Sequence, residues 1–247
     1  MFLATDLDGT FLGGSEEDRE KLYRIIKNNS GITLTFVTGR SLPSVLEVLQ
    51  SGQIPFPNYF ICDVGARVVN GQTLEPILPL QDEIEKRWPG EKPIEEILKG
   101  IQGLVRQQVP QHLRVSYFLE ETGKLEEIEA LVKSIGCEAV YSNKKYLDIL
   151  PKSVSKGSTL SYLVKALGID PESVLVAGDT LNDLSMFRCG FNGVAVGNSE
   201  FGLVNAIKYR NNVYHAQAEG AGGILEYMRR SDRFSAYLKE EASYCQQ

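Results

Sequence analysis

The most restrictive feature of this chain is an alternation of short apolar runs with helical patterns in its first and last thirds. Apolar or β-branched runs occupy residues 2–5, 33–37, 59–62, 173–177 and 193–196, and helical patterns occupy residues 17–27, 43–49, 159–167 and 183–187. Such short, continuous apolar runs are typical of strands that are buried on both faces. The alternation therefore predicts an α/β fold with a Rossmann-like, doubly wound parallel sheet.

The middle of the chain follows a different pattern. Prolines at positions 76, 79, 89 and 93 precede a helical pattern at 94–108, which is followed by a strand at 114–119, a helix at 124–135 and strands at 138–141 and 146–150. This order lacks the regular alternation of the two ends, so it favours a smaller α+β unit inserted into the larger fold. We predict a core domain of residues 1–79 and 153–247 and an inserted domain of residues 80–152.

Composition narrows the class of protein. The 247 residues are 43% hydrophobic and 23% charged, as in ordinary soluble globular proteins. A net charge of -6 argues against a general nucleic-acid binder, which needs concentrated Lys and Arg. No window approaches the ~20 apolar residues that would cross a bilayer, so we expect a cytoplasmic protein without membrane contact. The widely spaced cysteines favour reduced thiols over a zinc site; they are Cys62, Cys137, Cys189 and Cys245.

Two aspartates stand directly after the first apolar run, in the stretch DLDGT at 6–10. A carboxylate at a strand end can attack phosphorus and form an acyl phosphate, which suits Asp6. Asp8 points the same way along an extended chain, so it can protonate a leaving alcohol and then activate water. Gly9 allows a sharp turn that brings backbone N–H groups towards an anion. Taken alone, a stretch of this kind is more often a turn or a metal loop.

Two further polar residues follow a predicted strand end or begin a predicted helix. The hydroxyl of Thr38, after the run at 33–37, can donate to a phosphate oxygen, although a capping Thr or Ser in a strand-to-helix turn explains it too. Lys156 lies near the first turn of a helix that Ser155 or Ser158 can cap. A helix N-terminus repels a cation, so this lysine favours a partner such as a phosphate or Asp6, unless it points into solvent.

A second pair of carboxylates follows the apolar run at 173–177. Asp179 ends the run and Asp183 lies four residues later, so both can face one point above the sheet. Oxygen ligands of this kind suit Mg²⁺, and Asn182 can hold a neighbouring carboxylate or a substrate oxygen. Two acids near a helix start also make an ordinary capping arrangement.

In order, these four stretches resemble the four motifs of the haloacid dehalogenase superfamily of phosphohydrolases. The resemblance covers residues 1–79 and 153–230. It implies that Asp6 accepts the phosphoryl group, that Asp8 is the acid and base, and that Thr38 and Lys156 hold the phosphate and its charge. It also implies a Mg²⁺ site, whose ligands would be Asp6, the backbone carbonyl of Asp8 and Asp179, with Asp183 close by.

The inserted unit lies where this superfamily carries a cap, and its α+β pattern resembles the type C2B cap of the sucrose-phosphate phosphatase branch. Three further stretches are similar to that branch: CDVGARV at 62–68, YLDILPKSVSKG at 146–157 and HAQAEGAGGILEYM at 215–228. Many sugar phosphatases of this subclass have Asn-Gly-Ala where this chain has Val64-Gly65-Ala66. That departure favours the sucrose-phosphatase-like branch.

The resemblance implies a Mg²⁺-dependent phosphatase that acts through an aspartyl phosphate on sucrose 6-phosphate or a related disaccharide phosphate. Residues that we expect to bind the substrate are Gly39, Arg40, Ser41, Tyr117, Lys144, Asp148 and Asn182, although polar strand residues are usually just solvated. The alternatives are a phosphatase for mannosyl- or glucosyl-phosphoglycerate or a monosaccharide phosphate, a phosphomutase, and an inactive module that binds sugar phosphates. An association with a glycosyltransferase that makes the phosphorylated sugar stays open.

Overall fold

The structure is a computed structural model that describes residues 1–242, with side chains for residues 1–238. The strands are β1 (Phe2–Thr5), β2 (Thr33–Val37), β3 (Tyr59–Cys62), β4 (Arg67–Asn70), β5 (Leu104–Arg106), β6 (Val115–Leu119), β7 (Cys137–Ser142), β8 (Tyr146–Pro151), β9 (Val174–Gly178), β10 (Asn192–Ala195) and β11 (Val213–His215). The α-helices are α1 (Glu16–Asn28), α2 (Leu42–Leu49), α3 (Leu80–Glu85), α4 (Glu91–Ile97), α5 (Leu125–Ser134), α6 (Lys156–Ala166), α7 (Leu184–Phe187), α8 (Phe201–Ile207) and α9 (Gly220–Arg230).

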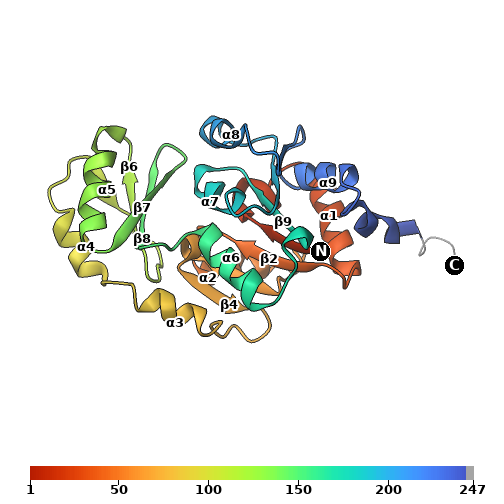
Figure 1. Ribbon diagram of the computed structural model, residues 1–247, viewed down its shortest axis with the longest axis horizontal. Coiled ribbons are helices and arrows are strands. Elements are labelled where there is room, and N and C mark those ends of the chain that lie inside the picture. Colours follow the sequence, from red (N-terminus) through yellow and green to blue (C-terminus); the bar gives the residue numbers. More distant parts are fainter. Residues whose placement is uncertain (243–247) are drawn as a thin grey trace.

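The strands form two sheets, which lie in separate parts of the molecule (Figure 1). The larger sheet has the order β11-β10-β9-β1-β2-β3-β4, and the smaller has the order β5-β6-β8-β7. In the larger sheet β1 pairs in parallel with both β2 and β9, and only the edge strand β4 is antiparallel. The predicted α/β fold with a parallel, doubly wound core is confirmed, with β4 and β11 as short edge strands that the apolar runs did not reveal.

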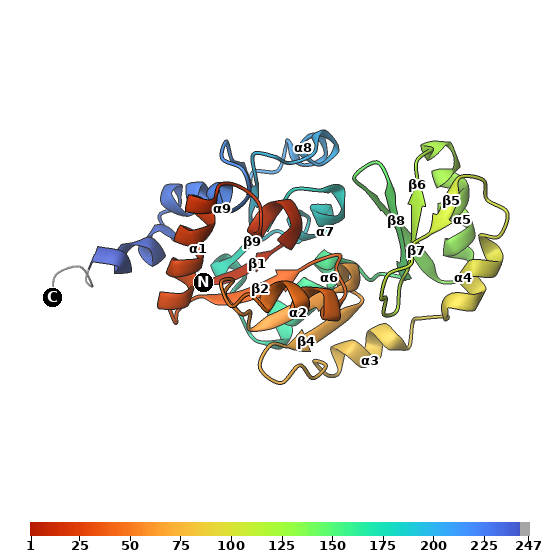
Figure 2. The same ribbon diagram turned by 180° about the vertical axis from the view of Figure 1, so that it is seen from behind.

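Both faces of the larger sheet are covered by helices (Figures 1 and 2). Alternate side chains of each strand point to opposite faces, so Leu3 and Phe36 pack with α1, α2 and α9, whereas Ala4 and Val176 pack with α6, α7 and α8. The four side chains are fully or almost fully buried. Burial on both faces is the physical reason why these strands appear in the sequence as unbroken apolar runs.

The smaller sheet is covered on one face by α4 and α5. Their side chains form a separate apolar cluster with Val115 and Leu119 of β6. The helix predicted at 94–108 is wrong, because α4 ends at Ile97 and residues 104–106 form β5, which pairs with β6. Gly100 and Gly103 have φ angles of 89° and 78°, which an α-helix does not allow, so the chain turns between the two elements.

Helix α3 lies inside the segment predicted as the insertion but packs on the larger sheet. Leu80 and Ile84 belong to the apolar cluster that contains Ala4 and Val176. The amide of Gln81 is held by the backbone of β4, since its Oε1 accepts a hydrogen bond from the Val68 N–H at 2.9 Å. The division at residues 79/80 and 152/153 stays a prediction, and the packing of α3 favours a first boundary after this helix.

Two smaller predictions can be compared with the described residues. Within residues 1–242, no helix combines the length and apolar character needed to cross a membrane. Cys62, Cys137 and Cys189 are free thiols, as the spacing predicts, and Cys245 lies outside the described residues.

The contact between α6 and α7 depends on a glycine. A Cβ atom at Gly157 would lie 2.1 Å from the carbonyl oxygen of Ser185, which is backbone and cannot rotate away. We therefore expect Gly157→Ala to lower the free energy of unfolding by about 2 kcal/mol, measured by urea denaturation. Gly123→Ala is the matched control, because a Cβ there meets no atom within 4 Å. Equal stability of the two variants would contradict the close packing.

Candidate active site

Three polar residues of the site stand at the carboxyl ends of neighbouring central strands. Asp6 follows β1, Thr38 follows β2, and Asp179 follows β9, and these strands are adjacent in the order β9-β1-β2. Parallel strands end at the same edge of a sheet, which brings these residues together although they lie far apart in the sequence. All three side chains are buried.

The loop after Asp6 turns sharply towards Asp179. Gly9 has a φ angle of 81°, and a Cβ atom there would lie 2.4 Å from Oδ2 of Asp179. The hydroxyl of Thr10 donates to Oδ1 of Asp179 at 2.7 Å, and the side-chain amide of Asn198 donates to the Gly9 carbonyl at 2.9 Å. Glycine at position 9 therefore allows the loop to lie directly against the second carboxylate.

Lys156 lies at the centre of the site with its side chain fully buried. Its Nζ donates hydrogen bonds of 2.7 Å to Oδ1 of Asp6, Oδ1 of Asn182 and Oδ1 of Asp183. Ser155 caps α6 at the preceding position, as the sequence predicts, and forms a capping box with Ser158. The cap fixes the start of the helix, and the three acceptors explain a cation where the helix dipole disfavours one.

Asp183 holds the second acidic loop in place. Its Oδ2 accepts hydrogen bonds from the backbone N–H groups of Asp179 and Thr180, both at 3.0 Å, while Oδ1 accepts from Lys156. The carboxylate is fully buried, so these partners replace its hydration. Asp183 thus fixes both the lysine and the loop that carries Asp179.

The pKa directions reflect this crowding of carboxylates. Burial raises the pKa of Asp6 well above its ordinary value; Lys156 opposes the shift, and Asp183 and Asp179 add to it. Burial, followed by the charge of Asp183, raises the pKa of Asp179 to about 7. Burial alone would lower the pKa of Lys156, but Asp183 and Asp6 hold it above its ordinary value. The lysine is therefore charged, and one cation faces several acids.

The acidic cluster fits a hard divalent cation. One carboxylate oxygen from each of Asp6, Asp179 and Asp183 lies within 4.8 Å of the others, and all three residues are buried. Fully ionised, they would carry three negative charges against the single charge of Lys156. Carboxylate oxygens are preferred ligands of such cations, and a bound cation would relieve the repulsion from Asp183, which adds to the effect of burial on the pKa of Asp179.

Asp8 and Arg40 form an ion pair in front of this buried cluster. Nε and Nη2 of Arg40 lie 2.7 Å from Oδ2 and Oδ1 of Asp8, which is a bidentate arrangement. Asp8 is exposed, and Arg40 is half-buried. The backbone N–H of Arg40 donates to Oγ1 of Thr38 at 3.1 Å, so the arginine and the predicted phosphate-holding hydroxyl share one turn.

A cavity of about 590 Å³ opens in front of Asp6 and Asp8, between the larger and the smaller sheet. Five residues predicted to bind substrate line it: Gly39, Arg40, Ser41, Asp148 and Asn182. Lining residues that the sequence did not single out include Gln107, Arg114, Ser142, Asn143 and Tyr146. The cavity therefore presents the acids on one side and polar and aromatic side chains of the smaller sheet on the other.

Two predicted substrate residues do not line this cavity. Tyr117 lies between Ser116 and Phe118 in β6, so its side chain points to the opposite face, where it is 5% exposed in the cluster under α4 and α5. Lys144 lies in the β7–β8 turn, where its neighbour Asn143 reaches the cavity instead. For Tyr117 the reason is the strand alternation, which places it on the helix side of the sheet.

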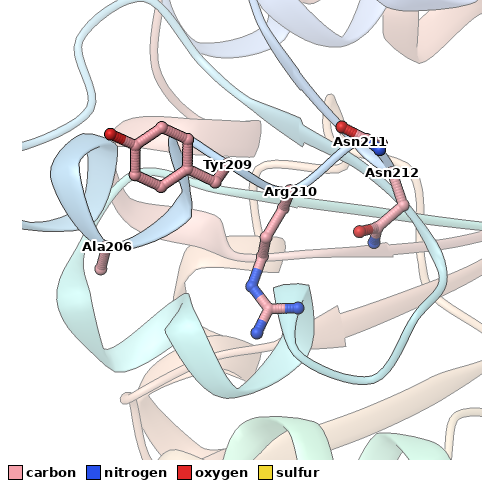
Figure 3. A pocket seen from close by; sticks show the side chains of 5 residues that line it. All are labelled: Ala206, Tyr209, Arg210, Asn211 and Asn212. Carbon is pink, nitrogen blue, oxygen red and sulfur yellow. The ribbon is translucent and has the colours of Figure 1, made fainter.

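A second hollow, of about 610 Å³, lies after α8 and is lined by Ala206, Tyr209, Arg210, Asn211 and Asn212 (Figure 3). Its side chains include no carboxylate and no lysine among these described residues. The amide of Asn212 already donates to the Phe191 carbonyl at 2.6 Å. The residues that can carry phosphoryl chemistry thus gather in the first cavity.

Sequence reasoning also missed a buried ion pair at the edge of the first cavity. Arg114 and Asp63 are both buried, and Nη2 of the arginine lies 3.1 Å from Oδ1 of the aspartate. Asp63 directly follows β3, so its place at a strand end was an available signal. Arg114 had no such signal, since it precedes β6 in the smaller sheet.

Comparisons with known proteins identify relatives of this chain. The family model of sucrose-6F-phosphate phosphohydrolase matches residues 1–231. A mannosylfructose-phosphate phosphatase from Agrobacterium fabrum is 33% identical over 92% of this chain and 95% of its own length. The structure of the sucrose-phosphatase from Synechocystis, solved with sucrose and phosphate, is similar with a TM-score of 0.85 and 26% identity, over 93% of this chain and 97% of that one.

A further relative is a much longer protein. A glucosylglycerol-phosphate synthase from Pseudomonas anguilliseptica is 48% identical over 227 residues, which are 92% of this chain. The chain spans only 30% of the length of that synthase. The similarity therefore concerns one part of the synthase.

Removal of the buried lysine charge should destabilise the site strongly. We expect Lys156→Met to lower the free energy of unfolding by about 3 kcal/mol near pH 8 in EDTA, because buried carboxylates lose their cation. The loss should shrink towards pH 5, since Asp6 has a raised pKa and becomes neutral as the pH falls. Urea denaturation at both pH values measures it.

The matched control is Lys165→Met, which removes an exposed lysine from the same helix. This variant should change stability by less than about 0.5 kcal/mol. A loss in Lys156→Met that is equal at both pH values would contradict the role of the lysine as counter-charge.

Proposed function

Because the chain belongs to the sucrose-6F-phosphate phosphohydrolase family, we propose that it is a Mg²⁺-dependent phosphatase that removes phosphate from a phosphorylated glycoside. The observation that carries this proposal is the buried contact of Lys156 with Asp6 and Asp183, at the base of a cavity that Asp8 also lines. It provides a nucleophile, a neutralising cation and a proton carrier at one point.

In the first step, a carboxylate oxygen of Asp6 attacks phosphorus, and the bond from phosphorus to the sugar oxygen breaks. Asp8 gives its proton to that oxygen, so the sugar leaves as an alcohol and Asp6 carries an acyl phosphate. Lys156, which donates a hydrogen bond to Oδ1 of Asp6, stabilises the negative charge that develops on the phosphoryl group as it is transferred.

In the second step, water attacks the phosphorus of the acyl phosphate. Asp8, now a carboxylate, takes a proton from this water, and the bond between phosphorus and the Asp6 oxygen breaks. Inorganic phosphate forms, and both aspartates return to their starting states. The hydroxyl of Thr38 and the amide of Asn182, at the edges of the buried cluster, would orient phosphate oxygens.

The residues that would hold Mg²⁺ are Asp6, Asp179 and the backbone carbonyl of Asp8, with Asp183 beside them. Bound there, Mg²⁺ supplies positive charge that offsets the negative charge of the transferring phosphoryl group. The close approach of Gly9 to Asp179 supports this assignment, because it leaves no room for a side chain beside the carboxylate.

The ion pair of Asp8 with Arg40 has a consequence for catalysis. While both carboxylate oxygens of Asp8 accept hydrogen bonds from Arg40, neither oxygen is turned towards a leaving group. To act as an acid, Asp8 must exchange this partner, and hydroxyl groups of a sugar beside Arg40 are suitable new acceptors for the guanidinium. Arg40 would then both bind the sugar and free Asp8 for its proton.

Features of the cavity and the names of the relatives support the proposed substrate class. Most side chains that face the acids across the cavity are polar or aromatic, as sugar recognition requires; they include Gln107, Asn143 and Tyr146, and Val109 and Pro110 add apolar surface. The family and two relatives are named for disaccharide phosphates, which supports sucrose 6-phosphate or mannosylfructose phosphate. The phosphate would lie at Asp6, with the distal sugar towards the smaller sheet.

A second candidate is glucosylglycerol phosphate. The relative named glucosylglycerol-phosphate synthase shares 48% identity, compared with 33% and 26% for the two phosphatases. A phosphatase that resembles part of such a synthase is suited to the phosphorylated product of that synthase. An association of this chain with a glycosyltransferase belongs to the same proposal.

Phosphate release from a panel of substrates tests both candidates. The panel contains glucosylglycerol phosphate, mannosylfructose phosphate, sucrose 6-phosphate, glucosyl-phosphoglycerate and glucose 6-phosphate, each with Mg²⁺ or with EDTA. We expect at least one phosphorylated glycoside to exceed glucose 6-phosphate by about tenfold or more in kcat/KM, since the distal unit adds contacts in the transition state.

Controls separate the outcomes of this panel. EDTA and Asp6→Asn should each remove phosphate release almost completely, because one removes the cation and the other the nucleophile. No release from any member would contradict the phosphatase proposal. Clear preference for glucose 6-phosphate would contradict the glycoside assignment only.

The role of Arg40 can be measured separately. We expect Arg40→Gln to raise KM for the preferred glycoside phosphate by about tenfold and to lower kcat, because the sugar loses a charged donor. Arg24→Gln in α1, outside the cavity lining, is a suitable control. Unchanged steady-state constants in Arg40→Gln would contradict the proposed contact with the sugar.

A further inference from the structure

We propose that Arg114 is a latch: a positioning residue that holds the smaller sheet over the active-site cavity and couples its position to the loop after β2. The inference rests on the proposed function, in which this cavity binds a sugar phosphate. The guanidinium of Arg114 joins the two sheets, since it contacts Asp148 of β8 as well as Gly39 and Asp63 beside the larger sheet.

The contacts of Arg114 are short and buried. Nη1 donates to the Gly39 carbonyl at 2.8 Å and to Oδ1 of Asp148 at 3.2 Å, and Nη2 lies 3.1 Å from Oδ1 of Asp63. The arginine is 6% exposed, and Asp63 is fully buried. Charged contacts in such places are stronger than on a surface, because water screens them little.

Gly39 and Asp63 are the partners of Arg114 beside the larger sheet. Both are linked through the backbone to the turn at 38–40, which is the proposed phosphate-binding turn. The N–H of Asp63 donates to the Arg40 carbonyl at 2.9 Å, and the N–H of Val64 donates to the Thr38 carbonyl at 3.1 Å. Arg114 therefore fixes the turn at 38–40 through a direct bond to Gly39 and through the residues after β3. A shift of the smaller sheet would be transmitted to this turn.

The partner in the smaller sheet is a residue of the cavity wall. Oδ1 of Asp148 accepts from Arg114 and, at 2.5 Å, from the hydroxyl of Ser116. Asp148 and Arg114 both line the cavity. With one carboxylate oxygen held by two donors, the other has a fixed position from which it can accept from a sugar hydroxyl.

The residues after β3 also contain features that destabilise the fold locally, which indicates a functional role. Among the described residues, neither buried carboxylate oxygen of Asp63 has a hydrogen bond of standard geometry, so the nearby charge of Arg114 is its main compensation. Asp63 and Val64 also have φ angles of 51° and 57°, which are unfavourable for residues with a Cβ. A buried carboxylate and backbone strain at one place destabilise the fold, and such features cluster where position matters for function.

The latch makes a distinctive kinetic prediction. A substrate with a sugar needs the smaller sheet in place, whereas p-nitrophenyl phosphate has no sugar to contact it. We expect Arg114→Gln and Asp63→Asn to raise KM for the preferred sugar phosphate about tenfold and KM for p-nitrophenyl phosphate much less, by about twofold to threefold through the turn at 38–40. A role confined to folding or to the reacting atoms would affect both substrates alike.

A matched control is available within the smaller unit. Arg106 of β5 pairs with Glu91 at 2.5 Å and also with Glu95, both in the same unit, and makes no ion pair to the larger sheet among the described residues. Arg106→Gln removes an ion-paired arginine of the cap region without touching the latch. It should leave KM for both substrates within about twofold.

The pH dependence adds a second readout for Asp63. Burial raises the pKa of Asp63 to about 7; Arg114, Arg67 and the main chain of His112 oppose this shift, and Asp148 adds to it. Below its pKa, Asp63 is neutral and its pair with Arg114 is lost. The KM ratio of Asp63→Asn to the wild type should therefore approach one near pH 5.5 and be largest above about pH 8.

Small-angle X-ray scattering without substrate tests the latch independently of any activity. Arg114→Gln should show a larger radius of gyration than the wild type and Arg106→Gln, because the two sheets separate more often. Equal loss with both substrates, unchanged KM in both latch variants, or unchanged scattering would each overturn the proposal. If Arg114→Gln fails to fold, Asp63→Asn, which keeps the side-chain shape, carries the same tests.

Discussion

The buried charge of Lys156 is the interaction on which the rest of this site depends. A fully buried ammonium is stable only with close counter-charges, and Asp6 and Asp183 supply them from opposite ends of the chain. The lysine therefore ties the end of β1, the start of α6 and the loop after β9 to one point. Any arrangement of the strands that separated these segments would leave Lys156 and Asp6 as buried charges without each other.

The buried part of the site, around Lys156, and its exposed part, at the cavity, differ in rigidity. In the buried part, Asp183 is held by two backbone N–H groups as well as by Lys156, so its position leaves little freedom. At the cavity, Asp8 is exposed, and among the described residues its side chain makes one ion pair, with the half-buried Arg40. This division suits a two-step reaction, in which the nucleophile must stay fixed while the proton carrier exchanges partners.

The sequence predicts the core of this structure well because two patterns, the apolar runs and the polar residues directly after them, arise from local physics. Continuous apolar runs indicate strands buried on both faces, and residues after such runs must meet at one edge of a parallel sheet. The same reasoning failed for the segment at 94–108, where two glycines with positive φ turn the chain and β5 forms through pairing with β6. It also failed for Tyr117, because nothing in its own sequence shows which face of the smaller sheet the helices cover. Arg114 escaped notice for a related reason: its partners Gly39 and Asp63 lie far away in the chain.

The two sheets contribute different kinds of information to the reaction. The larger sheet presents charges that any phosphate ester would need, so its residues indicate the chemistry but do not select among sugars. In the proposed function, selection would come from side chains such as Asn143, Tyr146 and Asp148, which line the cavity from β8 and the β7–β8 turn. Their effect depends on where the smaller sheet stands, and a buried arginine between the sheets links that position to the phosphate-binding turn. In the proposed function, the contacts of Arg114 would couple recognition of the sugar to preparation of the phosphate site, which is how a cap can favour its own substrate over smaller esters.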